Sequence, residues 1–278
     1  MLPLMLAAML CCFISSCGSD DDSLDDNKNN GVVDKDDDNN DVEFMDVLIS
    51  EENFPDWYFR DYLLKQDYGK DSVITAEEIK SITKIDVHDY SFNGYDGGIR
   101  SLKGIEYFAA LDTLDCSDNR ISSLDLSNNP ALRYLNCNGN CYISSLDLSN
   151  NPALERLYCG SNQLTSLDVY HNPALERLYC ENNQLTSLDV SNNLALKDLY
   201  CCRNQIKGEG MDALISSLPQ NTTNEVYGFF VIFRIEPTEH NVCTKAQVAA
   251  AKAKGWTPYE YSVWEVYPQW IEYDGYDY

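Results

Sequence analysis

The sequence has few basic residues and few histidines. Its 278 residues include 20 Lys and Arg against 45 Asp and Glu, which gives a formal net charge of −25, and only three histidines. A chain this acidic repels a phosphate backbone, so we expect no nucleic-acid partner. Three histidines supply little material for histidine-based catalysis or for a zinc site.

The sequence also lacks the short motifs that mark common enzymes. There is no GxSxG, no HExxH, no Walker loop and no glycine-rich dinucleotide turn. Many carboxylates are present, but no spacing singles out a catalytic pair. We therefore predict a protein that is not an enzyme and that uses no cofactor.

Charge is absent from the first 17 residues, MLPLMLAAMLCCFISSC, which are mostly apolar. The stretch is too short to span a bilayer comfortably and is typical of a secretory signal peptide. Ile14-Ser15-Ser16-Cys17 resembles a bacterial lipobox, which implies a lipid on Cys17. A signal peptide normally opens with Lys or Arg, and this stretch has neither. An ordinary signal peptide with an unmodified Cys17 is the alternative.

An acidic segment follows at residues 18–45. Residues 18–46 hold twelve acids and two lysines, and such dense charge with little apolar content predicts a disordered tether. The run Ser19-Asp20-Asp21-Asp22 resembles the export signal of surface lipoproteins of the Bacteroidetes. That resemblance implies a protein on the outer face of the outer membrane. The alternative is a solvated spacer that carries no export signal.

The middle of the chain repeats with a period near 21 residues. Five cysteines mark the period at spacings of 21, 22, 21 and 21 residues: Cys116, Cys137, Cys159, Cys180 and Cys201. A fixed period of this length indicates a solenoid, in which each unit buries its apolar face against its neighbours. We place the solenoid at residues 82–208.

The repeating unit reads L-x-x-L-x-C-x-x-N-x-[IL]-x-x-L-D-[LV]-x-x-N-P-A, from Leu111 to Ile206. It resembles the leucine-rich repeats of the short, internalin-like bacterial kind. The resemblance implies an α/β solenoid, a right-handed leucine-rich repeat with parallel β-strands. A single insertion in the second unit, at Cys141-Tyr142, should bulge at a turn and leave the register intact.

Alternation along LERLYC fixes which side chains point inward. Leu157 and Cys159 should face the core, whereas Arg156 and Tyr158 should face outward. A small cysteine suits a tight interior column, where it acts as a compact hydrophobe. We favour a reduced core ladder, with metal or disulfide use as the alternative.

The outward positions of these strands form the candidate ligand-binding face. Its residues are Tyr134, Arg156, Tyr158, Arg177, Tyr179 and Tyr200. Stacked tyrosines beside arginines are enriched at binding hot spots. Such a face could grip a protein loop or stack on a sugar ring, and the alternative is that the aromatic pairs only stabilise the sheet.

Three polar columns complete the repeat. Two asparagine columns should bond backbone groups that tight turns leave unpaired: Asn119, Asn140, Asn162, Asn183 and Asn204, and Asn129, Asn151, Asn172 and Asn193. An acidic column runs through Asp125, Asp147, Asp168 and Asp189. Like charges are tolerable there if each carboxylate accepts turn N–H groups, and a shared calcium ladder is the alternative.

Caps are expected at both ends of the solenoid. Residues 46–81 should be helical, with Phe54, Trp57, Tyr58, Tyr62 and Leu63 as an apolar face. The loop with Asp67, Asp71 and Glu78 resembles an EF-hand, but Gly69 and Ser72 depart from that pattern. We favour a helix-loop-helix without tight calcium, with calcium as the alternative. Residues 209–278 should form an α/β cap with an aromatic tail.

Together these features predict a lipid-anchored, monomeric protein on the cell exterior. It would use the strand face for protein binding or adhesion, with an extracellular protein as partner. A glycan-binding accessory lipoprotein and a structural envelope protein without a soluble ligand are the alternatives.

Overall fold

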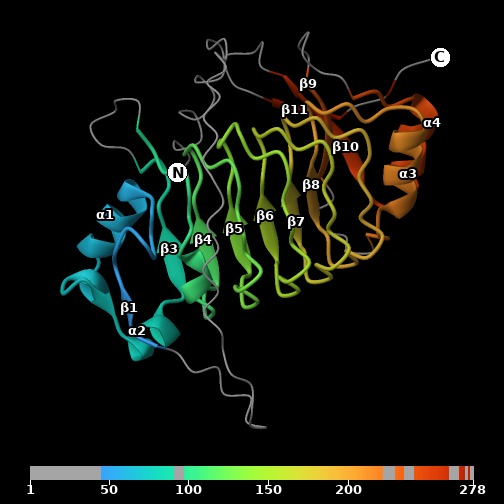
Figure 1. Cartoon of the computed structure of the whole chain (residues 1–278). Helices are drawn as coiled ribbons and strands as arrows, with labels where there is room; N and C mark the ends of the chain where they lie inside the picture. Colours follow the sequence, from blue (N-terminus) through green and yellow to red (C-terminus); the bar gives the residue numbers. More distant parts are fainter. Residues whose placement is uncertain are drawn as a thin grey trace. The chain divides into compact units, whose positions relative to one another are not determined.

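Nine β-strands stand side by side in one sheet, in the order β11-β10-β9-β8-β7-β6-β5-β4-β3 (Figure 1). The computed structural model describes residues 45–90, 97–221, 229–234, 241–262, 269–272 and 275. The predicted signal peptide with Cys17, and the tether up to residue 44, lie outside these residues. None of the described helices has the length and apolar character needed to cross a membrane.

The repeat strands are short and parallel, as the sequence predicts. They are β3 (Lys84–Asp86), β4 (Thr113–Asp115), β5 (Tyr134–Asn136), β6 (Arg156–Tyr158), β7 (Arg177–Tyr179) and β8 (Asp198–Tyr200). The sheet continues in parallel through β9 (Phe229–Arg234) and β10 (Thr257–Ser262), and β11 (Gln269–Glu272) adds an antiparallel edge. The leucine-rich repeat solenoid is therefore confirmed.

Core packing follows the predicted alternation. In β6, Leu157 and the following Cys159 are fully buried, whereas Arg156 is exposed and Tyr158 half-buried. The buried ladder cysteines Cys137 and Cys159 are free thiols. Burial raises the pKa of Cys137 to about 12 and lifts the pKa of Cys159 well above its ordinary value. These thiols stay protonated at physiological pH and act as compact apolar filling.

Buried asparagines tie each turn to its neighbours. The Nδ2 of Asn183 donates to the carbonyls of Cys159 and Cys180 at 3.0 and 3.1 Å, and its Oδ1 accepts the amide of Leu164 at 2.9 Å. The second column works through Nδ2 alone, as in Asn172, which donates to two carbonyls of the preceding turn. The predicted structural role of both columns is confirmed.

The C-terminal segment supplies one more member of the first column. Asn241 donates to the Cys201 carbonyl at 2.8 Å and accepts the amide of Ile206 at 2.8 Å. The sequence does not reveal this, because Asn241 lies 37 positions after Asn204, outside the 21-residue period. A residue of the α/β cap therefore completes the hydrogen bonds of the last turn of the solenoid.

The insertion in the second repeat bulges as predicted. Cys141 has a left-handed backbone with φ of 63°, and Tyr142 is 45% exposed. The pairing of β5 with β6 stays in register. The cost appears one turn later, because the buried Oδ1 of Asn162 has no hydrogen-bond partner among the described residues. In the following turns an amide 19 positions earlier fills this role, as Leu164 does for Asn183.

Deleting Cys141 should restore the regular turn and stabilise the protein. The amide of Ile143 lies 19 positions before Asn162 and would then face its Oδ1. A recovered buried hydrogen bond is worth about 1 kcal/mol, so the midpoint of urea unfolding should rise correspondingly. Deletion of Arg120, the regular residue at the same turn, serves as the control and should destabilise. An unchanged or lower midpoint for the Cys141 deletion would contradict the assignment.

The N-terminal elements are helical in part. They comprise β1 (Val47–Leu48), α1 (Trp57–Lys65), the 3-10 helix η1 (Asp67–Gly69), β2 (Val73–Ile74), α2 (Ala76–Ser81) and, later, the 3-10 helix η2 (Ile105–Tyr107). The predicted apolar face needs correction. Trp57 is 52% exposed, whereas Phe59 and Leu63, four residues apart, are fully buried. Helical spacing from Leu63 selects Phe59 for the core and turns Trp57 outward.

Aromatic and polar contacts join these elements to the first repeats. The Phe54 ring lies 5.7 Å from that of Phe59 and 6.4 Å from that of Phe108. The Tyr62 hydroxyl accepts the amide of Asp86 in β3 at 3.2 Å. As Figure 1 shows, α1 and α2 lie at the β3 end of the sheet, so they cover the first repeat.

The C-terminal elements form the predicted α/β arrangement. α3 (Glu209–Ser217) packs against α4 (Lys245–Ala253), which begins with a capping box between Thr244 and Gln247. Trp256 is fully buried and donates its Nε1–H to the Pro219 carbonyl at 2.7 Å. Part of the aromatic tail forms β11, so its backbone pairs with β10 and extends the sheet.

Candidate functional site

Four tyrosines form a continuous ladder across β5 to β8. The Tyr134 and Tyr158 ring centroids are 5.4 Å apart, those of Tyr158 and Tyr179 are 4.8 Å apart, and those of Tyr179 and Tyr200 are 4.1 Å apart. Tyr158, Tyr179 and Tyr200 are in register on adjacent strands. Tyr134 belongs to the neighbouring column, opposite Arg156, and joins the ladder along a diagonal. We name these four residues the tyrosine ladder.

Strand spacing explains why the rings touch one another. Identical side chains in register on strands about 4.8 Å apart pack their rings against each other. Burial raises the pKa of Tyr134 to about 12 and holds the pKa of Tyr179 and Tyr200 above the usual range, since it disfavours the phenolate. Tyr134, Tyr179 and Tyr200 are therefore uncharged at physiological pH, and their hydroxyls remain hydrogen-bond donors and acceptors.

The two arginines beside the ladder have different environments. Arg177 pairs with Asp198 on the next strand, with Nε 3.2 Å from Oδ2, and Asp198 is only 7% exposed. Burial raises the pKa of Asp198, and the positive charge of Arg177 opposes that rise. Arg156 is exposed, and no carboxylate of the described part of the chain lies within ion-pair distance of it. It is thus a cation available to a partner in a strongly acidic protein.

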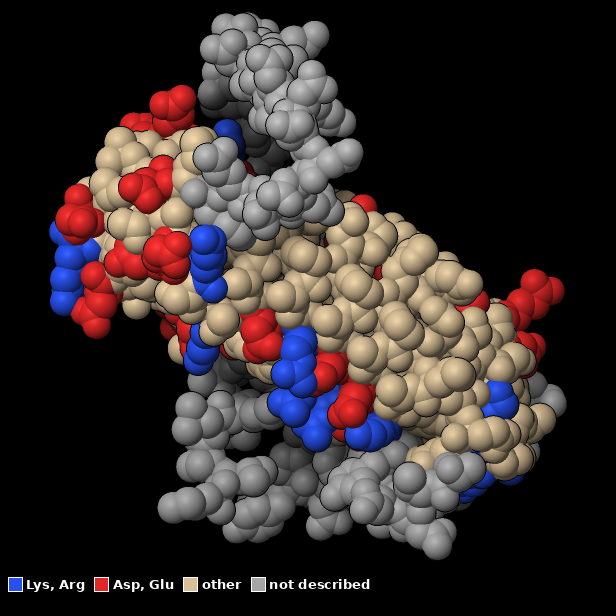
Figure 2. Space-filling view, turned by 90° about the horizontal axis from the view of Figure 1, so that it is seen from below, with Lys and Arg blue, Asp and Glu red and all other residues tan. Residues whose placement is uncertain are grey.

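A charged column precedes the ladder, one residue before each strand. Arg133 pairs with Glu155 at 2.6 Å and lies 3.7 Å from Asp112. Lys197 pairs with Glu176 at 2.9 Å. Figure 2, the view from below, shows basic and acidic side chains in contact in one cluster beside a broad area with few charges. Arg133 and Lys197 are thus paired with acids, whereas Arg156 has no such pair among the described residues.

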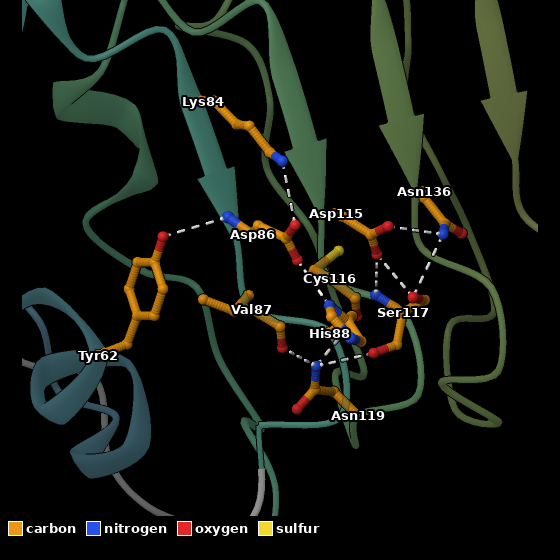
Figure 3. A network of polar contacts seen from close by, with 10 residues as sticks. All are labelled: Tyr62, Lys84, Asp86, Val87, His88, Asp115, Cys116, Ser117, Asn119 and Asn136. Carbon is orange, nitrogen blue, oxygen red and sulfur yellow. Dashed lines mark hydrogen bonds and ion pairs between the residues drawn. The ribbon is translucent and has the colours of Figure 1, made fainter. Parts of the chain in front are cut away.

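Toward β3 the same face is polar. Asp86 is hydrogen-bonded to the His88 ring at 2.7 Å and forms an ion pair with Lys84 at 3.2 Å (Figure 3). Asp115 accepts hydrogen bonds from the side chains of Ser117 and Asn136. The hydrogen bond to Asp86 raises the pKa of His88. Every side chain in this network already has partners inside the protein, so the polar half of the face is less suited to binding than the tyrosine half.

The remaining predicted acids lie apart from the strand face. Each member of the acidic column accepts a turn amide two residues later, with Asp125 to Ser127 at 3.0 Å and Asp189 to Ser191 at 2.8 Å as its ends. Hydrogen bonds from the Ser127 side chain and then from its amide lower the pKa of Asp125. The predicted acceptance of turn amides by this column is confirmed. A shared calcium ladder stays the alternative.

The EF-hand-like acids serve local roles. Asp67 pairs with Lys70 at 2.5 Å, Asp71 accepts the amide of Val73 at 3.1 Å, and Glu78 closes the capping box with Thr75. Among the residues that the structure describes, no group of three His, Cys, Asp or Glu side chains could hold a metal ion. The favoured helix-loop-helix without tight calcium stays a prediction, with calcium at Asp67, Asp71 and Glu78 as its alternative.

One functional contrast could have been found from the sequence. Asp198 stands where the two preceding repeats carry Arg156 and Arg177. Opposite charges in register on adjacent strands predict an ion pair. The sequence therefore allows Arg177 to be identified as the arginine that pairs with Asp198, whereas Arg156 has no acid in register beside it.

Comparison with known proteins agrees with this architecture. The family described as Leucine Rich repeats (2 copies) matches residues 110–151 and again residues 152–194. An internalin C2 structure from Listeria monocytogenes is similar, with a TM-score of 0.58 and 18% identity, over 77% of this chain and 86% of that one. A search among curated proteins found no match.

Two further solved structures resemble the chain less closely in shape. The functional domain of InlJ from Listeria monocytogenes, described as including a cysteine ladder, has a TM-score of 0.32 and 21% identity over 75% of this chain. The present chain spans 55% of that domain. A leucine-rich repeat protein of Leptospira interrogans has a TM-score of 0.41 and 18% identity, over 56% of this chain and 39% of that one.

Proposed function

We propose that this leucine-rich repeat protein binds an extracellular partner protein through the tyrosine ladder and Arg156. The carrying observation is that Arg156, exposed and without a carboxylate partner in the described residues, lies directly across from Tyr134 and beside Tyr158. Tyrosine and arginine dominate binding hot spots, because they bury large areas and keep hydrogen-bonding groups. The matching partner chemistry is an apolar loop with a carboxylate for Arg156.

Ring geometry favours a protein over a sugar at this face. Stacking on a sugar requires an open ring face, but the rings of Tyr158, Tyr179 and Tyr200 lie 4.1–4.8 Å from their neighbours. Each ring is thus in close contact with its neighbour, at interplanar angles of 70° and 39°, which limits the space for a sugar ring between them. A contiguous row of phenols suits the mixed apolar and hydrogen-bonding contacts of a protein interface. The internalin-like fold is compatible with such a role.

The proposal includes a lipid anchor at Cys17 and display on the cell exterior. The lipobox-like Ile14-Ser15-Ser16-Cys17 and the acidic run after it support this. Replacing Cys17 by alanine should abolish incorporation of radiolabelled palmitate and release the protein from the membrane fraction. Surface protease treatment of intact cells should degrade the parent protein; full protection would reject exterior display, and retained labelling of the variant would reject the anchor site.

Binding at the ladder can be tested with graded variants. After affinity capture of a partner from host extracellular proteins, Tyr158→Ala, Tyr179→Ala and Tyr200→Ala combined should weaken binding by more than about 100-fold, since each hot-spot residue contributes about 2 kcal/mol. Arg156→Ala alone should weaken it by about tenfold or more, and added salt should reduce that difference. Surface plasmon resonance gives the affinities.

Matched controls separate lost contacts from lost folding. The corresponding triple phenylalanine variant keeps the stacked rings and should fold normally, so its affinity isolates the hydroxyls. Ser149→Ala, on the opposite edge, should bind like the parent. If the triple alanine variant folds and binds with unchanged affinity, the ladder is not the binding face.

A further inference from the structure

The third repeat departs from the other three at two adjacent exposed positions. Where the others carry Ser and Asn, as at Ser127-Asn128, Ser149-Asn150 and Ser191-Asn192, this repeat carries Tyr170-His171. Both residues are exposed, and the Tyr170 side chain is 58% exposed. The solenoid forms equally well with Ser and Asn at these positions, so the scaffold does not require Tyr170.

The position of Tyr170 is nevertheless well fixed. Its amide donates to Asp168 Oδ1 at 2.9 Å, and its carbonyl accepts a short hydrogen bond from Asn192 Nδ2. The His171 ring lies 5.3 Å away at an interplanar angle of 82°. An edge-to-face contact of this kind orients the phenol ring while leaving most of it open.

Tyr170 borders an open hollow of about 360 Å³ between the third and fourth repeats. It is lined by one tyrosine, three serines, two leucines, one asparagine and two aspartates: Ser166, Leu167, Asp168, Tyr170, Ser187, Leu188, Asp189, Ser191 and Asn192. One oxygen of Asp168 and one of Asp189 accept turn amides at 2.9 and 2.8 Å. Because a carboxylate offers about four acceptor sites, each retains capacity for a ligand hydroxyl.

The same hollow exists earlier in the solenoid without an aromatic wall. A hollow of about 380 Å³ is lined by Leu124, Asp125, Leu126, Ser127, Asp147 and Asn150. Its carboxylates Asp125 and Asp147 also accept turn amides. The repeat itself therefore produces the hollow and its acids, and the third repeat adds an open aromatic ring to them.

We propose that Tyr170, Asp168 and Asp189 form a binding subsite for a pyranose ring of an uncharged glycan. The apolar C–H face of the sugar would lie on the open Tyr170 ring, and its hydroxyls would donate to the two carboxylates. Concave sites with an apolar wall and a few placed polar groups are the usual form of small-ligand sites. The exposed carboxylates exclude sialylated or sulfated sugars by repulsion. This site is separate from the tyrosine ladder and does not depend on partner binding there.

A glycan array with the full-length protein tests the subsite. Neutral oligosaccharides should bind and sialylated or sulfated ones should not, and isothermal titration with the strongest neutral oligosaccharide then gives the affinity. Tyr170→Ser restores the residue of the other repeats, so its melting temperature should equal that of the parent. Its affinity should fall at least tenfold, whereas Tyr170→Trp should retain binding.

Two controls locate the binding. The Tyr158/Tyr179/Tyr200 triple alanine variant should bind the glycan like the parent, because the subsite lies away from the ladder. Asp168→Asn and Asp189→Asn combined should weaken the neutral oligosaccharide at least tenfold. The proposal is overturned if no neutral oligosaccharide binds, if Tyr170→Ser binds as the parent does, or if only the ladder variant loses binding.

Discussion

Replacing Asn183 by alanine should lower the free energy of unfolding by about 3–4 kcal/mol. The change removes the hydrogen bonds from Nδ2 to the carbonyls of Cys159 and Cys180, and it leaves the buried amide of Leu164 without its acceptor. Each lost bond costs about 1 kcal/mol, and an orphaned buried donor costs about 1–3 kcal/mol. Urea unfolding followed by circular dichroism measures the change.

Asn162 provides the matched control one turn earlier. It donates to the carbonyls of Cys137 and Cys159 in the same way, but no donor among the described residues reaches its Oδ1. Asn162→Ala therefore orphans no amide and should cost about 1–2 kcal/mol less than Asn183→Ala. Equal costs for the two variants would show that the Leu164 amide does not depend on Asn183.

Replacing Glu181 by glutamine should stabilise the protein at pH 8 by about 2 kcal/mol. Glu181 Oε2 is inaccessible and has no hydrogen-bond partner among the described residues, and its side chain occupies space that Gly160 leaves open. A Cβ at position 160 would lie 2.7 Å from Glu181 Oε1. Burial, opposed in part by the residue's own amide, raises the pKa of Glu181 to about 7.

The pH dependence of this effect has a definite sign. Below about pH 4.5 the carboxyl is protonated in the folded and the unfolded chain, and it contributes no difference. Between about pH 4.5 and 7 the unfolded chain loses the proton first, so stability falls as pH rises, and above that range the loss is complete. The full shift corresponds to about 3 kcal/mol, which partial exposure of the side chain reduces to about 2.

Urea midpoints of parent and Glu181→Gln at pH 4.5 and pH 8 measure the effect. Glutamine is neutral at both values, so the two proteins should be nearly equal at pH 4.5 and differ at pH 8. Because parent and variant are compared at the same pH, the titration of groups that both proteins share, such as His88, cancels. Glu155→Gln, which removes an exposed carboxylate paired with Arg133, is the control and should not stabilise at pH 8. If the stability difference between Glu181→Gln and the parent is the same at pH 4.5 and at pH 8, the pKa of Glu181 is not raised.

The repeats were predictable because their period enforces the same backbone at each turn. Once Cys159 and Leu157 are assigned to the core, alternation places Arg156 and Tyr158 outward, and the strand register follows from the constant spacing. The asparagine roles followed for the same reason, since each turn presents the same backbone groups. Identical local sequence thus determined the fold class and the identity of the exposed columns.

Outside the period the sequence was less informative. In α1 the sequence analysis placed Trp57 on the apolar face, whereas the folded chain buries Phe59, whose ring packs 5.7 Å from that of Phe54, and leaves Trp57 52% exposed. Asn241 joins the first asparagine column from a segment with no repeat signal. Such choices depend on which surface a segment meets, which no local pattern encodes.

The sequence by itself determined the solenoid, its inward and outward columns and the candidate face, because a fixed period gives every repeat the same environment. The tertiary structure decided how the rings of that face meet, with centroids 4.1–4.8 Å apart from Tyr158 to Tyr200. It also showed that the Arg177–Asp198 ion pair forms, whereas no carboxylate of the described residues lies within ion-pair distance of Arg156. It also showed that Tyr170 borders a hollow with two carboxylates. Availability depends on distances between neighbouring turns, and those distances arise only when the repeats stack.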